Sequence, residues 1–127
     1  MSNLRLVDDP NGGGVGLAGG SLTLARVVAA YSTSITPDSS QGNLISITAT
    51  DGVAFTINAP LNPATGKQIT FVIRNTSGGA LGAITWNAVF KMPAFTSPAT
   101  ANSRSITFQY DGTNWVEMYR GAADVPN

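Results

Sequence analysis

The segment over residues 105–118 constrains the fold of this chain more than any other part. Polar and apolar residues alternate over residues 105–110, a period of two that is typical of a half-buried β-strand. The Asp111-Gly112 pair then favours a tight turn, because glycine tolerates positive φ and aspartate can bond its own backbone. Trp115 opens a return strand. The segment therefore predicts a hairpin in an antiparallel sheet, with an apolar face made of Ile106, Phe108 and Tyr110.

Shorter strand patterns separated by turn-forming residues precede this hairpin. We expect strands at residues 44–48, 53–58, 67–75, 83–86 and 89–91. The Asp51-Gly52 pair between the first two is a hairpin signal. No internal repeat is evident, and short strands broken by turns predict an all-β sandwich or barrel. We expect Phe71, Ile73, Ile106 and Phe108 to be buried on facing sheets.

The N-terminal part of the chain has a different character. Residues 1–20 end in a run dense in glycine, which cannot form a stable helix or strand alone. They fit a flexible linker or an extended arm ordered by a neighbour. Residues 21–31 fit either a helix capped by Ser21 or an extended segment, and we favour the extended one. The chain thus divides into an arm and linking segment at residues 1–31 and a β-sandwich domain at residues 32–127.

Composition excludes several classes of chemistry. The chain has 127 residues, enough for one domain with a real core. It contains no cysteine and no histidine, which excludes disulfides, thiolate metal sites and a Ser-His-Asp triad. Seven basic residues balance seven acidic ones, and only 11% of residues are charged. We therefore expect no enzyme activity, no cofactor, no metal and no nucleic-acid partner that is bound by phosphate neutralisation.

The sequence also argues against a membrane or secretory role. No stretch reaches the roughly 20 apolar residues needed to span a bilayer. The N-terminus lacks the basic start followed directly by an apolar run that a secretory signal requires. We expect synthesis in a cytoplasm and no membrane partner.

Three short motifs imitate functional sites. Gly14–Gly19 matches the dinucleotide fingerprint, but no buried strand leads into it and no alternating β-α pattern follows, so we interpret it as part of a flexible arm. Asn75-Thr76-Ser77 has the form of a glycosylation acceptor and is interpreted as a polar turn. Asp8-Asp9 is interpreted as solvated charge, because two adjacent carboxylates on an arm rarely form a cation site.

The sequence does not decide whether two sets of side chains stabilise the fold or bind a ligand or partner. Aromatic residues beside polar ones could form a carbohydrate platform or pack in the core, and they are Trp86, Tyr110, Trp115 and Tyr119. Arg74 and Arg104 lie on expected strands, where they could pair with carboxylates or anchor an interface.

Three segments together resemble a β-rich module of tailed-bacteriophage structural proteins. These are residues 70–79, the Ile84-Thr85-Trp86 triplet and the closing stretch over residues 106–115, which reads F-x-Y-D-G-T-N-W at its end. The resemblance covers roughly residues 43–120. The module occurs in tail fibres, in head fibres and in small capsid decoration proteins, which are also called cement proteins.

The resemblance implies a virion component of jelly-roll type, which is an antiparallel β-sandwich, here preceded by the glycine-rich N-terminal arm. A chain of 127 residues with such an arm and one sandwich looks most like a small decoration protein on the outer capsid surface. Such a protein would bind the major capsid protein, bridge neighbouring subunits and form a dimer or trimer on the head. It implies no catalytic, cofactor-binding or metal-binding residues. The alternatives are a tail-fibre or head-fibre component and a carbohydrate-binding β-sandwich module.

Overall fold

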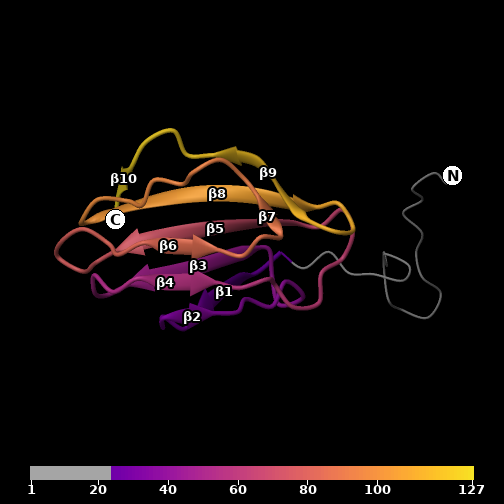
Figure 1. Ribbon diagram of the computed structural model, residues 1–127, viewed down its shortest axis with the longest axis horizontal. Helices are drawn as coiled ribbons and strands as arrows, with labels where there is room; N and C mark the ends of the chain where they lie inside the picture. The colour runs from indigo at the N-terminus through magenta and orange to yellow at the C-terminus, as the bar shows by residue number, and fades with distance from the viewer. Residues whose placement is uncertain (1–23) are drawn as a thin grey trace, which may run out of the picture.

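The computed structural model describes residues 24–127, and the regular elements of this range are all β-strands (Figure 1). The predicted all-β class is therefore confirmed. A helix long and apolar enough to cross a bilayer is absent from this part of the chain. The arm predicted at residues 1–20 lies outside the described residues. Within the ambiguous segment at residues 21–31, Arg26–Ala29 form strand β1, which is the extended alternative.

The chain alternates between two sheets as it coils. In the larger sheet, β1 pairs in parallel with β3 (Leu44–Ala49), which pairs in parallel with β5 (Gln68–Asn75). In the smaller sheet, β4 (Phe55–Ile57) pairs in parallel with both β2 (Ser34–Ile35) and β6 (Ile84–Trp86). Figure 1 shows these strands stacked above one another in both sheets. The result is a solenoid-like stack in which each coil contributes one strand to each sheet.

Antiparallel strands extend the larger sheet beyond β5. β8 (Asn102–Tyr110) pairs with β5 and with β9 (Trp115–Arg120), and β10 (Val125–Pro126) also pairs with β8. β7 (Phe90–Lys91) lies at the far edge, parallel to β9. The predicted C-terminal hairpin is confirmed, because Tyr110 pairs with Trp115 across the turn.

The hairpin predicted around Asp51-Gly52 is wrong. β3 and β4 flank this turn but lie in different sheets, and each pairs with strands of the neighbouring coils. The predicted antiparallel pairing is thus replaced by parallel pairing throughout residues 26–86. A turn signal specifies only a local change of direction. The apolar faces of β3 and β4 are buried by facing each other across the interior, which side-by-side pairing in one sheet would not achieve.

Neighbouring segments hold this turn in place. Asp51 Oδ1 accepts hydrogen bonds from the hydroxyl of Tyr31 at 2.7 Å and from the N–H of Val53 at 3.0 Å. On the other side, a Cβ atom at Gly82 would lie 2.4 Å from the backbone nitrogen of Ala54, closer than any side chain can approach. The chain crossing here therefore requires glycine.

The core lies between the two sheets. Equivalent inward positions align from coil to coil, so Val27, Ile45 and Phe71 form one row of the larger sheet and Ile35, Ile57 and Trp86 form one row of the smaller sheet. Burying each large apolar side chain contributes about 1.5–3 kcal/mol. Phe71, Ile73, Ile106 and Phe108 are all fully buried, as predicted. They do not lie on facing sheets, however, because β5 and β8 are neighbours in the larger sheet.

Phe108→Ala is expected to lower the free energy of unfolding by about 3–5 kcal/mol, because it removes a fully enclosed ring. Tyr119→Ala is the matched control, since Tyr119 is 63% exposed. Its cost should stay within about 0.5 kcal/mol. Chemical denaturation of both variants measures the difference, and equal costs would mean that Phe108 does not face the core.

The contact between Tyr31 and Asp51 predicts a dependence of stability on alkaline pH. Burial and the hydrogen bond to Asp51 raise the pKa of Tyr31 from 10.0 to about 12. Because the folded state favours the protonated phenol, this stabilisation is complete below pH 10 and is lost as the pH rises to about 12. Tyr31→Phe should flatten the fall in unfolding free energy over that window, whereas Tyr119→Phe should leave it unchanged. Denaturation series from pH 9 to pH 12 test this.

Candidate functional site

The carboxylates at Asp38, Asp51 and Asp111 lie at separate turns. Hydrogen bonds from nearby donors hold the pKa of each below its ordinary value, as the Ser40 hydroxyl does for Asp38. Between residues 24 and 127, no group of three or more acidic, histidine or cysteine side chains is placed to hold a metal ion. These carboxylates therefore act as turn-stabilising acceptors.

The glycosylation-like motif is built into the fold. Asn75 is fully buried, and its Nδ2 donates to the carbonyls of Gly79 at 2.9 Å and Pro98 at 3.0 Å. Its Oδ1 accepts the Ser77 N–H at 2.9 Å. This arrangement agrees with the polar-turn interpretation, because the carboxamide has no room for a glycan. Gly14–Gly19 and Asp8-Asp9 lie outside the described residues.

The two arginines that the sequence left open have different surroundings. Arg104 Nη2 lies 2.7 Å from Asp124 Oδ1, and Asp124 also accepts the N–H of Ala99 at 2.9 Å. The Ala99 N–H, followed by Arg104, lowers the pKa of Asp124. Arg104 thus holds the C-terminal segment in place. Arg74 is exposed on the larger sheet.

The four aromatic residues do not gather on one outer face. Trp115 is 1% exposed and packs on Tyr110, with ring centroids 4.9 Å apart. Trp86 is partly buried and packs edge-to-face on Phe71 at 5.3 Å, against the core. Tyr119 is exposed on β9. The structure therefore assigns three of the four to packing and separates them from Tyr119.

The outer face of the larger sheet is broad and nearly free of charge. Strand register and alternation place small hydroxyl and aliphatic side chains there, with Arg26 and Arg74 as its charged members. Thr70 and Thr107 join β5 to β8 through their hydroxyl oxygens, which are 2.8 Å apart. By register the face comprises Arg26, Val28, Leu44, Ser46, Thr48, Gln68, Thr70, Val72, Arg74, Ser103, Ser105, Thr107, Gln109, Val116 and Tyr119, of which Ser103 and Thr107 are buried.

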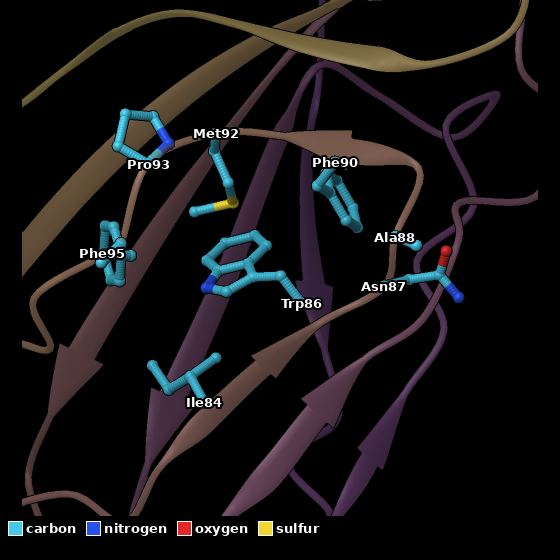
Figure 2. Close-up of a pocket in the computed structure, with 9 residues that line it drawn as sticks. Ile84, Trp86, Asn87, Ala88, Phe90, Met92, Pro93 and Phe95 are labelled. Carbon is cyan, nitrogen blue, oxygen red and sulfur yellow. The ribbon is translucent and has the colours of Figure 1, made fainter.

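A pocket of about 370 Å³ opens beside β6. Figure 2 shows Trp86 at its centre, with Phe90 and Met92 above the indole and Phe95 beside it. The Trp86 ring contacts the Phe90 and Phe95 rings edge-to-face, with centroids 5.2 and 5.5 Å apart. The lining residues are Ile84, Trp86, Asn87, Ala88, Phe90, Met92, Pro93, Ala94 and Phe95.

The indole nitrogen of Trp86 is the unusual group in this pocket. Its Nε1–H is buried and finds no hydrogen-bond acceptor among the described residues. Leaving a buried donor unpaired costs about 1–3 kcal/mol. In Figure 2 the nitrogen lies on the side of the ring that faces Phe95, whose ring is at best a weak acceptor.

Arg120 fixes the wall of the pocket opposite β6. Its guanidinium donates to Glu117 at 2.7 Å and to the carbonyls of Ala94 at 2.6 Å and Pro93 at 3.0 Å. It also lies 5.8 Å from the centroid of the Phe95 ring, in a cation–π arrangement. The hydrogen bond to Glu117 raises the pKa of Arg120, so the guanidinium stays charged.

A polar ladder on the smaller sheet was missed at the sequence level. Ser34, Thr56 and Thr85 align in register across its outer face. Asn58 Nδ2 crosses to β2 and donates to the hydroxyls of Ser34 and Thr36, both at 2.9 Å. The sequence does contain a signal for this ladder, a recurring triplet. Its first residue is Ser or Thr, its second is apolar and its third is Thr or Asn, and it occurs at residues 34–36, 56–58 and 85–87. Unequal spacing between the triplets hides this repeat.

Comparison of the chain with protein-family models, curated proteins and solved structures finds no match. The described residues offer a broad outer face on the larger sheet and a pocket lined mostly by apolar side chains.

Arg120→Lys is expected to lower the free energy of unfolding by about 1–3 kcal/mol, because the single ammonium nitrogen of lysine, with three N–H donors, cannot reproduce the four hydrogen bonds that the guanidinium makes from three nitrogens. Arg74→Lys is the matched control, because Arg74 is exposed, and should change stability by less than about 0.5 kcal/mol. Denaturant titration measures both. Equal small effects would show that the guanidinium does not hold residues 93–95.

Proposed function

We propose that this chain is a structural subunit of a tailed-phage virion, a decoration protein on the outer surface of the capsid. It binds the major capsid protein, bridges neighbouring subunits and stabilises the DNA-filled head. The observation that carries the proposal is the outer face of the larger sheet, which is wide, rigidly backed by the core and has Arg26 and Arg74 as its charged residues. Its hydroxyl and aliphatic side chains lose water at low electrostatic cost when they meet another protein.

Bridging explains how a small protein of this kind can reinforce a capsid. A copy that holds two capsid subunits makes its second contact intramolecularly, so two weak contacts give strong attachment. A net charge of zero adds little repulsion between copies packed at high density. Self-association into a dimer or trimer around a capsid symmetry axis belongs to the same proposal.

The resemblance supports the virion location and not the detailed topology. It implies a jelly-roll, whereas the strands over residues 26–86 pair in parallel in a solenoid-like stack. The likeness to the phage module therefore supports a structural role for the chain. Of the jelly-roll, we propose only the general feature of a β-domain with two sheets.

A specific observation favours the alternative of a tail-fibre or head-fibre component. β1 pairs only with β3, and β2 pairs only with β4, among the strands of residues 24–127. Within the described part of the chain, both sheets thus have a free edge at the start of the stack. A parallel edge of this kind can accept a further coil, as a fibre assembled from stacked modules would require.

Charge placed on the outer face of the larger sheet is expected to weaken capsid binding. Val28→Glu and Tyr119→Glu should each reduce occupancy on undecorated capsids of the parent phage at least tenfold, equivalent to about 1.4 kcal/mol. Both side chains are more than half exposed, so the fold should tolerate the change. Val53→Glu, at an exposed loop position, is the matched control and should bind normally.

The same particles should then be heated while DNA release is followed. Capsids carrying the unmodified protein should retain DNA to a higher temperature than those with either face variant, most clearly at low salt, where packaged DNA repels itself more strongly. Failure of the unmodified protein to bind capsids would overturn the decoration role. Binding to purified tails in that case would identify the fibre alternative.

A further inference from the structure

The two sheets of this protein have unequal extents. The larger sheet continues beyond β5 through β8 and β9, whereas the smaller sheet ends at β6 within the described residues. In Figure 1 the chain leaves β6 and passes through β7 and a long loop before it enters β8. The described residues therefore provide no fourth strand for the smaller sheet, and a loop runs past the outer edge of β6 without pairing with it.

The outer edge of β6 has backbone groups available for pairing. The bonds that join β6 to β4 include the Ala83 carbonyl and the Asn87 N–H. Because alternate residues of a strand direct their backbone groups to opposite sides, Ile84 and Trp86 direct theirs to the free edge. Neither residue has a backbone hydrogen bond to a loop among the described residues. The edge offers two N–H groups and two carbonyls.

The Trp86 pocket lies directly beside this edge. It separates β6 from residues 92–95, and its volume of about 370 Å³ is within the range of protein binding pockets. The side chains of Ile84 and Trp86 line it, so a strand laid along the edge would point alternate side chains into it. Its lining contains no charged residue.

We propose that the β6 edge and the Trp86 pocket together bind an extended, uncharged peptide strand of a partner protein. The strand pairs with Ile84 and Trp86 through its backbone and inserts an aliphatic or aromatic side chain into the pocket. This is β-strand addition, in which main-chain bonds provide affinity and a pocket for alternate side chains provides selectivity. The proposal does not require that the partner is a capsid protein.

The pocket chemistry favours a peptide over a sugar. A sugar ring needs several polar partners for its hydroxyls, and Asn87 is the one lining side chain with a carboxamide. Its Oδ1 already accepts the Val89 N–H at 3.0 Å. The remaining polar groups at the edge are backbone groups, which match the spacing of another strand.

The test uses the full chain and a display library of heptapeptides in which threonine, a strand-favouring residue, alternates with randomised residues. Selection on the unmodified protein should enrich peptides with aliphatic or aromatic residues at randomised positions. Ala94→Trp fills the pocket from an exposed position and should weaken binding of the enriched peptides at least about tenfold. Ala64→Trp, on an exposed loop, is the matched control and should bind normally.

Two readouts separate strand addition from simple hydrophobic contact. N-methylation of peptide residues whose N–H faces β6 should abolish binding, whereas N-methylation of the adjacent residues should not. In NMR spectra the backbone amides of Ile84 and Trp86 and the Trp86 indole proton should shift on binding, while the Trp115 indole proton should not.

Three outcomes overturn the proposal. They are enrichment that is equal on the Ala94→Trp variant, binding that is insensitive to N-methylation, and a Trp86 indole shift produced by free monosaccharides but not by any peptide. Because none of these measurements involves a capsid, they are independent of the decoration role.

Discussion

Contacts between inward side chains of the two sheets hold this structure together. Phe71 of the larger sheet meets Trp86 of the smaller sheet edge-to-face at 5.3 Å, and both rings contact Phe90 and Phe108. This aromatic cluster lies where the parallel coils end and the antiparallel strands begin. It therefore joins the parallel and antiparallel halves of the fold. The register of each neighbouring strand is set by the need to direct its apolar residues toward the interior between the sheets.

The same cluster explains why the functional candidates lie where they do. The larger sheet needs β8 and β9 to cover Phe71, but the smaller sheet receives no fourth strand within residues 24–127. A loop held by Arg120 closes the gap incompletely, which leaves the Trp86 pocket and the free edge of β6. Outside the core, neutral hydroxyl side chains dominate the larger sheet's outer face. The decoration and fibre proposals both use these surfaces for contact with other proteins.

Prediction from sequence succeeded where the interaction is local. Alternation over residues 105–110 and the Asp111-Gly112 turn correctly predicted the β8–β9 hairpin, since its two strands pair with their sequence neighbours. The same reasoning failed at Asp51-Gly52, where the strands on either side join different sheets. Turn residues favour a change of direction, but they carry no information about which strand lies alongside. The pocket was also beyond prediction, because Trp86 and Phe95 meet only through the packing of β6 against the loop that follows β7, which no strand or turn pattern specifies.

The sequence alone determined the all-β class, the apolar faces of β5 and β8, and the absence of cysteine and histidine chemistry. These follow from side-chain period and residue type, which do not depend on the rest of the fold. Only the tertiary structure decided that the first six strands stack in parallel coils, that Asn75 is a buried connector and that Arg104 and Arg120 are structural. Each of these depends on at least one contact with a separate segment of the chain, as Asn75 has with Pro98, Arg104 with Asp124 and Arg120 with Ala94. The physical reason is that strands become neighbours when together they bury their apolar faces. The buried surface is formed by many strands at once, so no single segment specifies it.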